Sequence, residues 1–149
     1  MMEIPISFIL LLASVESNHN AFAKGKHGEI GFLQMTSAYV QDASEYANED
    51  WVHQDCISEF TAIQIFRAYM ARYATEKRLG RPVTYQDIAR IHNGGPNGYK
   101  KESTIPYWNK VKKVSIFGID FTYKGNLHFA EAGRACCEYW LGKCVESGM

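Results

Sequence analysis

The chain has 149 residues, of which 46% are apolar and 21% charged, and this is the size and composition of one globular domain. Its 16 basic residues balance 16 acidic ones, so net charge gives no reason to expect nucleic acid or an anionic membrane as the main partner. The longest apolar stretch, Ile4 to Val15, is interrupted by Pro5 and Ser7 and is too short to cross a bilayer about 30 Å thick, so no membrane span is predicted.

This apolar stretch is predicted to form a buried helix that ends near Asn18. No basic segment precedes it, and Ala13-Ser14-Val15 is a poor cleavage site, so it is not a convincing signal peptide. We therefore expect Met1 to Val15 to remain in the active protein.

The next predicted elements are a turn and two helices. Residues 20–30 contain Gly25 and Gly28, which favour a turn-rich segment or short hairpin. Thr36 or Ser37 is expected to cap a helix that reaches about Ala47. Apolar residues recur every three or four positions from Glu59 to Tyr73 and predict an amphipathic helix, whose buried stripe comprises Phe60, Ile63, Phe66, Met70 and Tyr73.

Local signals also divide the second half of the chain. Thr84 and Asp87 have the spacing of a capping box and predict a helix that ends before the Asn93–Gly98 loop. Pro106 favours a helix start after Thr104, and this helix should extend to about Lys113. Residues 115–125 are expected to be extended or irregular, and residues 128–141 to form a last helix. The fold class predicted from these elements is α+β and predominantly helical, with a small hairpin or extended element and a C-terminal helical extension.

The cysteines indicate neither a disulfide scaffold nor a metal site. Three of the four lie near the C-terminus, and together with His128 they lack the C-x-x-C spacing of a zinc site; the four are Cys56, Cys136, Cys137 and Cys144. Buried free thiols are expected, although a bridge from Cys56 to the C-terminal group stays open in an oxidising compartment. We expect no metal and no other cofactor.

Three distant segments suggest chemistry. They are Val15-Glu16-Ser17, Gly28-Glu29-Ile30-Gly31-Phe32-Leu33-Gln34-Met35 and Ile91-His92-Asn93-Gly94-Gly95-Pro96-Asn97-Gly98. The first two resemble motifs of soluble lytic transglycosylases and goose-type lysozymes. The third, with residues 67–73 before it and Tyr107-Trp108-Asn109-Lys110-Val111 after it, resembles invertebrate-type lysozymes. Together they are similar to the lysozyme-like superfamily over about residues 8–113.

The resemblance implies a lysozyme-like catalytic domain at residues 1–114, with residues 115–149 as an extension packed on it. It also implies a glycosidase that acts on peptidoglycan glycan strands, at the β-1,4 bond between N-acetylmuramic acid and N-acetylglucosamine. Such an enzyme works in the periplasm, outside the cell, or after delivery to the cell wall. We expect a monomer, and the C-terminal helix could dock a protein partner through Tyr139 and Trp140, although such aromatic residues more often belong to a core.

Physical reasoning points to Glu16 as the catalytic acid. It ends an otherwise apolar helix, where desolvation and the negative end of the helix dipole both favour the protonated carboxyl group. A general acid that protonates a glycosidic oxygen needs such a raised pKa. Without the other motifs, a Glu that reaches solvent at a helix end would be the better interpretation.

Further candidate residues come mainly from the resemblance. Gln34 offers a donor and an acceptor for hydroxyl or acetamido groups, or is a structural amide. The resemblance places Gln34, Asn93 and the glycines that begin at Gly94 along the cleft, and Ser17 is part of the Glu-Ser motif. Tyr107 matches a tyrosine that hydrogen-bonds the catalytic glutamate, or it is an exposed aromatic residue. His92 either contacts substrate or is a packed, hydrogen-bonded histidine.

A hydrolysing glycosidase generally needs a second carboxylate. Invertebrate-type lysozymes carry an Asp between the catalytic Glu and the Gln, but here the only acidic residue in that interval is Glu29. Glu29 lies inside the glycine motif, so two roles stay open, a second carboxylate or a solvated charge on a hairpin.

A lone acid favours a lytic transglycosylase that forms 1,6-anhydro products, because intramolecular attack replaces the water and the second carboxylate. This is the leading hypothesis from the sequence. The alternatives are a hydrolytic muramidase that uses Glu29 or a more distant Asp, a non-catalytic glycan-binding relative, and a structural component of a larger assembly.

Overall fold

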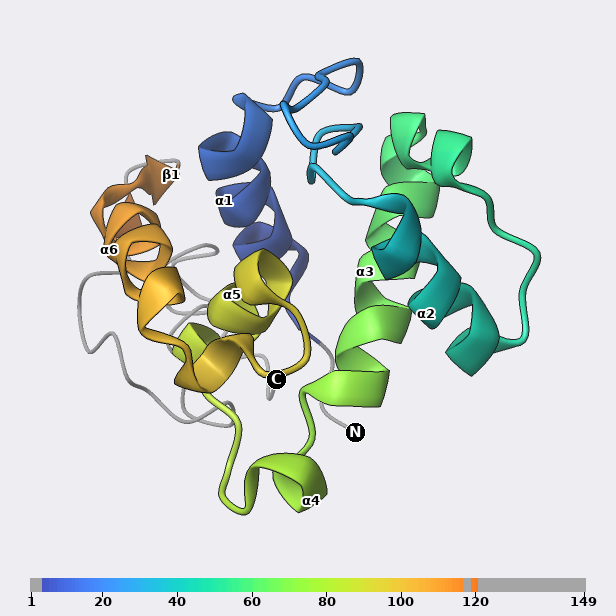
Figure 1. Ribbon diagram of the computed structural model, residues 1–149. Coiled ribbons are helices and arrows are strands. Elements are labelled where there is room, and N and C mark those ends of the chain that lie inside the picture. Colours follow the sequence, from blue (N-terminus) through green and yellow to red (C-terminus); the bar gives the residue numbers. More distant parts are fainter. Residues whose placement is uncertain (1–3, 117–118, 121–149) are drawn as a thin grey trace, which may run out of the picture.

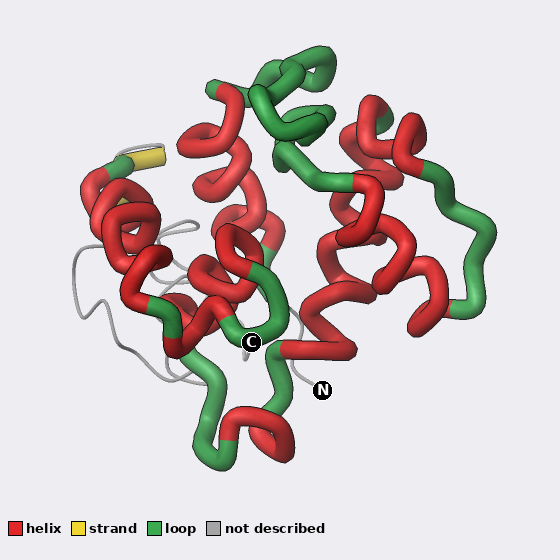
Figure 2. The backbone as a smooth tube through the Cα atoms, in the orientation of Figure 1, coloured by secondary structure: helices red, strands yellow, loops and turns green. Residues whose placement is uncertain are grey.

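The computed structural model describes residues 4–116 and 119–120, and these residues are mainly helical (Figures 1 and 2). The α-helices are α1 (Ile6–Ser17), α2 (Ser37–Ala47), α3 (Glu59–Tyr73), α4 (Glu76–Leu79), α5 (Tyr85–Gly94) and α6 (Ile105–Lys113). Short 3-10 helices are η1 (His53–Ile57), η2 (Gly98–Lys100) and η3 (Glu102–Thr104). The two-residue strands β1 (Ser115–Ile116) and β2 (Ile119–Asp120) pair antiparallel, with Ser115 opposite Asp120.

Several expectations concern residues outside this described part. They are the last helix at residues 128–141, its docking surface at Tyr139 and Trp140, and the group formed by His128 and the three C-terminal cysteines. In the described part, Cys56 is a buried free thiol. No helix among residues 4–116 is both long and apolar enough to span a bilayer.

Helix α1 forms the centre of the core. Phe8, Ile9, Leu11 and Leu12 have no exposed surface, and the ring of Phe8 stacks on that of Tyr85 at 4.4 Å. Full burial of each large apolar side chain stabilises the fold by about 1.5–3 kcal/mol. Figure 1 shows α1 and α5 between the α2 and α3 pair on one side and α6 with β1 on the other. The apolar N-terminal segment is therefore an integral core helix.

Local capping signals set the starts of α2 and α5 as predicted, but α5 continues to Gly94, two residues into the segment predicted as a loop, because its backbone hydrogen bonds continue until Gly95 caps the helix. The Thr36 hydroxyl accepts from the backbone N–H of Tyr39 at the start of α2. Thr84 and Asp87 form the expected capping box at the start of α5. Helix α1 ends at Ser17, and the next residue, Asn18, adopts a left-handed conformation with φ 54°.

The predicted stripe of α3 is wrong at one position. Phe66 and Met70 are buried, but Phe60 is 73% exposed. The buried face of the helix also includes Ala62, Ile65 and Tyr69, because this face packs against α2 and α5. The prediction took the most apolar residues at helical spacing as the buried face. The packing of α3 against its neighbours buries a face that does not include Phe60.

The segment between α1 and α2 crosses one end of the molecule and carries the glycine motif (Figure 2). It contains isolated bridges that pair Ile30 with Lys24 and Met35, in place of regular hairpin strands. Gly31 has φ +85°, and a side chain there would collide with the backbone of Cys56. This close contact fixes the segment against η1.

Candidate active site

A cleft of about 340 Å³ separates the end of α1 and the glycine segment from α2, α3 and α5. Five residues predicted for the site line it, namely Glu16, Glu29, Gln34, His92 and Asn93. They come from three segments that are far apart in the sequence. The fold therefore brings most of the predicted constellation together.

Glu16 lies in the last turn of α1, at the wall of the cleft. The pKa of its carboxyl group is raised from the ordinary 4.5 to about 7, mainly by burial and also by the negative charge of Glu29. The Tyr107 hydroxyl and the Lys110 ammonium group oppose the increase. Glu16 can therefore hold a proton near neutral pH and release it.

Tyr107 lies on α6 and is 9% exposed. Its hydroxyl reaches the Glu16 carboxyl, but it has no partner in strict hydrogen-bond geometry among the described residues. Burial and the neighbouring Glu16 raise the pKa of Tyr107, so the hydroxyl keeps its proton and is available as a donor. This position agrees with the predicted contact between Tyr107 and the acid.

Gln34 adopts a left-handed conformation with φ 50°, which is uncommon for a residue other than glycine. Its side-chain amide N–H₂ donates to the carbonyl groups of Ala23 at 3.1 Å and Gly31 at 2.8 Å. Both donors are therefore occupied within the protein, and Oε1 remains as an acceptor. Gln34 cannot donate to an acetamido group, as the sequence had suggested, without giving up one of these bonds.

Glu29 is partly exposed, and its carboxylate folds back over the turn that precedes it. Oε2 accepts from the backbone N–H of His27 at 2.9 Å. Hydrogen bonds from its own backbone N–H and from that of His27 lower the pKa of Glu29. The cleft thus holds one carboxyl group that favours the proton and one that favours the charge.

His92 lies in the cleft lining but is only 7% exposed, and both ring nitrogens have partners within the protein. Nε2 donates to the carbonyl of Leu33 at 3.0 Å, so Nδ1 accepts from the Tyr39 hydroxyl at 3.0 Å. Burial lowers the pKa of His92 to about 4. The structure therefore favours the packed histidine over the residue that contacts substrate, because no ring nitrogen is free.

Besides Tyr107, the predicted residues Ser17 and Gly94 do not line the cleft. The Ser17 hydroxyl donates to the carbonyl of Phe32 at 2.7 Å and accepts from the backbone N–H of Asn20. Gly94 packs against the side chain of Thr104, and its carbonyl accepts from Lys101. These contacts within the protein indicate a structural role for Ser17 and Gly94 and not the expected role in binding substrate.

Asp42, Tyr39 and Tyr69 also line the cleft, although no sequence pattern indicated them as site residues. Tyr39 and Tyr69 stack with ring centroids 3.7 Å apart, and the Tyr73 hydroxyl donates to Asp42 at 2.9 Å. Asp42 lies on the polar helix α2. No local pattern distinguishes it from a solvated helical charge, and only the packing of α2 on α3 reveals its position.

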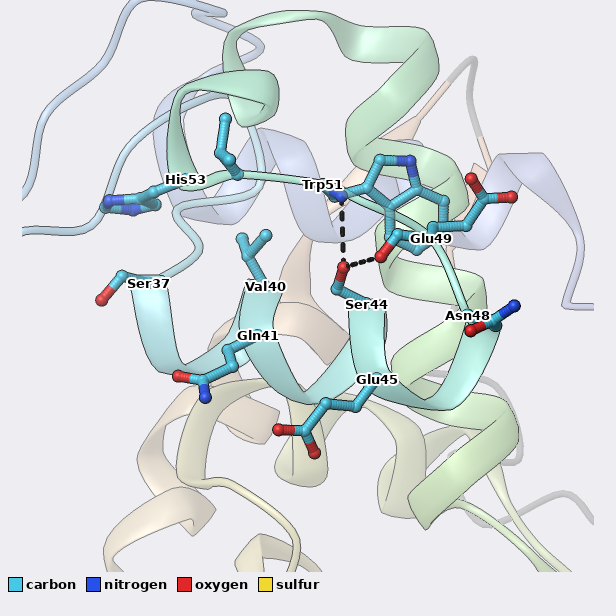
Figure 3. Close-up of a pocket in the computed structure, with 10 residues that line it drawn as sticks. Ser37, Val40, Gln41, Ser44, Glu45, Asn48, Glu49, Trp51 and His53 are labelled. Atoms are coloured by element: carbon cyan, nitrogen blue, oxygen red, sulfur yellow. Dashed lines mark hydrogen bonds between the residues drawn. The ribbon is translucent and has the colours of Figure 1, made fainter.

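A second hollow of about 450 Å³ lies on a different face of α2, beneath residues 48–53 (Figure 3). Figure 3 shows that the Ser44 hydroxyl holds this loop, because it donates to the Glu49 carbonyl and accepts from the backbone N–H of Trp51. The hollow is larger than the cleft but contains none of the predicted site residues. We therefore assign the candidate active site to the cleft around Glu16.

The family model described as Destabilase matches residues 9–114, which include every residue of this cleft. The chain belongs to the Destabilase family. The match begins inside α1 and ends just after α6, so it covers the part of the chain that builds the site.

Curated relatives of this Destabilase chain are named lysozymes. It is 41% identical to the lysozyme of Meretrix lusoria over 86 residues, and this match covers 57% of this chain and 66% of the relative. It is 33% identical to an invertebrate-type lysozyme of Ruditapes philippinarum over 85 residues, and this match covers 56% of this chain and 59% of the relative. The matched region thus spans less than two thirds of these relatives.

Solved structures agree with the lysozyme-like fold of the Destabilase chain. Meretrix lusoria lysozyme in complex with Aeromonas hydrophila PliI superposes with a TM-score of 0.65 at 33% identity, covering 75% of this chain and 91% of the other. The inhibitor-bound lysozyme from the same organism gives 0.63 at 34% identity, with the same coverage. The predominantly helical lysozyme-like fold predicted from the sequence is therefore confirmed.

These comparisons support the resemblance to invertebrate-type lysozymes. They give no support to the resemblance to soluble lytic transglycosylases and goose-type lysozymes. That resemblance depended on two short motifs, at Glu16 and Gln34, whereas the resemblance to invertebrate-type lysozymes depended on the longer segment from Ile91 to Val111.

Proposed function

We propose that the protein is a hydrolytic muramidase, a lysozyme that cleaves the β-1,4 bond between N-acetylmuramic acid and N-acetylglucosamine in peptidoglycan. One observation carries this proposal. Glu16, with a pKa raised to about 7, and Glu29, with a lowered pKa, line the same cleft. Two carboxyl groups with opposite shifts are what acid-assisted hydrolysis of a glycoside requires.

In this reaction Glu16 is the general acid. It donates its proton to the glycosidic oxygen as the bond to the anomeric carbon breaks, so the leaving sugar departs as a neutral alcohol. Positive charge develops on the sugar ring, and the Glu29 carboxylate stabilises it. Water completes the reaction at the anomeric carbon. These steps need only the two carboxyl groups, Glu16 and Glu29.

The transglycosylase hypothesis rested on the lack of a second carboxylate near Glu16 in the sequence. In the folded chain Glu29 and Asp42 both line the cleft. The charge of Glu29 acts directly on the pKa of Glu16, which makes it the nearer candidate for the second carboxylate. A second carboxylate in the cleft, together with the lysozymes among the relatives, favours hydrolysis over transglycosylation.

The remaining residues of the cleft would orient the glycan. Asn93 is exposed and presents an amide group with donors and an acceptor to sugar hydroxyl and acetamido groups. Ser17 and His92 act indirectly, since they hold the backbone at Phe32 and Leu33, next to Gln34. Because the proposed substrate is a cell wall polymer, the protein must reach it outside the cytoplasm of the producing cell or in lysed bacteria.

Digestion of purified peptidoglycan tests the proposal. The wild-type protein should release muropeptides with reducing N-acetylmuramic acid ends, which mass spectrometry distinguishes from 1,6-anhydro ends. The Glu16→Gln variant keeps the shape of the side chain but has no proton to donate, so its turnover should fall by roughly 10³-fold or more. Anhydro ends would contradict the hydrolytic mode, and binding without cleavage by the wild-type protein would indicate a glycan-binding relative.

A further inference from the structure

Two parts of the cleft lining are joined by Arg78, a residue outside the lining itself. The helical part carries Asp42 and Tyr69, on α2 and α3, and the loop part carries Gly95 and Pro96, just after α5. Arg78 lies on the short helix α4, in the segment that connects α3 to α5, and is half-buried. Figure 1 shows α4 at the end of the molecule opposite to the glycine segment.

The guanidinium group of Arg78 bonds directly to the loop part. Nη1 donates to the carbonyl of Pro96, and Nη2 donates to Oδ1 of Asn97 at 2.8 Å. The ring of Tyr99, in η2, lies against the same guanidinium group, with its centroid 5.8 Å from Cζ. Hydrogen bonds from a charged donor are stronger than those from a neutral one, so these contacts hold the loop firmly.

The same guanidinium group also contacts the end of α3. Nη1 donates to the Tyr73 carbonyl at 3.2 Å, and Cζ lies 5.5 Å from the centroid of the Tyr73 ring. Tyr73 in turn reaches the helical part, because its hydroxyl donates to Asp42 at 2.9 Å and its ring packs against that of Tyr69 at 4.8 Å. One planar group on Arg78 is therefore connected to both parts of the cleft lining.

We propose that Arg78 is a positioning residue that fixes the helical part and the loop part relative to each other, and thereby shapes the surface that binds the glycan strand. The guanidinium donors point in fixed directions, so their bonds to acceptors on two segments leave little freedom in the separation of these segments. Arg78 is not among the groups that shift the pKa of Glu16, so it does not act on the proton transfer itself. This inference rests on the proposed muramidase function and names what holds its substrate-binding surface.

Steady-state kinetics on soluble peptidoglycan fragments give the first test. Arg78→Met keeps a long side chain but removes the charge and every donor, so KM should rise about ten-fold while kcat changes less than about two-fold. The alkaline limb of the pH–rate profile should stay in place, because Glu16 keeps its neighbours. Lys77→Met is the matched control, since Lys77 is exposed on the same helix and loses the same charge, and its KM should equal that of the wild-type protein.

Hydrogen exchange separates a positioning role from a general loss of stability. The backbone N–H groups of Gly98 and Lys100 donate to the carbonyls of Gly95 and Asn97, so their exchange reports on the order of the loop. In Arg78→Met this exchange should become about ten-fold faster or more, whereas exchange in the core helix α1 should not change. An equal acceleration in α1 would mean that Arg78 stabilises the whole fold, and it would overturn the inference.

Arg78→Lys covers the case in which Arg78→Met does not fold. It keeps a charge beside the two tyrosine rings, but a single nitrogen cannot reach the partners of Nη1 and Nη2 together, so its KM should lie above the wild-type value. If the wild-type protein cleaves peptidoglycan and no folded Arg78 variant raises KM, this inference alone is wrong. If the wild-type protein neither binds nor cleaves peptidoglycan, the proposed function fails together with the inference.

Discussion

The Tyr107 hydroxyl lies buried beside the Glu16 carboxyl and opposes the effect of burial on that acid. Desolvation raises the pKa of Glu16, whereas a donor next to the carboxylate stabilises the charged form. The balance places the pKa at about 7. An acid at this value can lose its proton to a substrate and regain it from water within one turnover.

Removal of this hydroxyl should make Glu16 a weaker acid. In Tyr107→Phe the pKa of Glu16 rises, because the donor that favours its anion is lost. We expect the alkaline limb of the pH–rate profile to move to higher pH and turnover to fall by up to about ten-fold. Tyr46→Phe, at a position that is 53% exposed, is the control and should leave the profile unchanged. An unshifted limb in Tyr107→Phe would remove Tyr107 from the site.

The two carboxyl groups predict a bell-shaped pH dependence. Activity should fall as Glu16 loses its proton around pH 7 and again at low pH, where Glu29 becomes protonated below its ordinary pKa of 4.5. In Glu29→Gln the negative charge that raises the pKa of Glu16 is gone, so the residual activity should have its alkaline limb at lower pH. A limb that stays in place would mean that the two groups do not interact.

Glu16 should also make the fold less stable in alkaline solution. Its pKa is about 7 in the folded chain and near 4.5 when unfolded, so the folded state binds more protons between these values and loses stability as pH rises through them. Glu16→Gln removes this effect and should gain up to about 3 kcal/mol above pH 7, with no gain below pH 4.5. Denaturant unfolding at pH 4 and pH 8 measures the difference. Equal gains at both pH values would contradict a buried, protonated Glu16.

Gly31 should tolerate no side chain. The added methyl of Gly31→Ala would collide with the Cys56 carbonyl, and φ is +85°, so strain and overlap combine and the loss should be about 3 kcal/mol or more. Gly80→Ala has a similar φ of +77° in open space and should cost only about 1 kcal/mol. Thermal unfolding of the pair separates the two effects, and equal losses would mean that the contact with Cys56 contributes nothing.

Local signals made much of the fold predictable. The caps at Thr36 and Thr84 and the proline near the start of α6 each act within one turn of chain, and the apolar run of α1 is continuous in the sequence, so the sequence alone locates them. Helix α4 was missed, since its four residues are too few to establish a period. The exposure of Phe60 depends on which helices pack against α3, and this information is not local.

The candidate site was predictable where a motif marked it. Glu16, Gln34 and Asn93 belong to such motifs and meet in the cleft. Asp42 has no distinctive neighbours in the sequence, and its position in the cleft depends on the packing of α2 on α3. His92 was recognised, but its role depended on tertiary hydrogen bonds to Tyr39 and Leu33 that no spacing reveals.

The buried, neutral His92 opposes the effect of Glu16 on the pH dependence of stability. Burial lowers the pKa of His92 from 6.5 to about 4, so between these pH values the unfolded chain binds a proton at His92 and the folded chain does not. The folded state therefore loses stability at His92 as pH falls through this range. Glu16 does the opposite between pH 4.5 and 7. From pH 4.5 to 6.5 the effects of His92 and Glu16 on the free energy of unfolding have opposite signs and cancel. Mild acid therefore protonates Glu16 without a net loss of stability from these two groups.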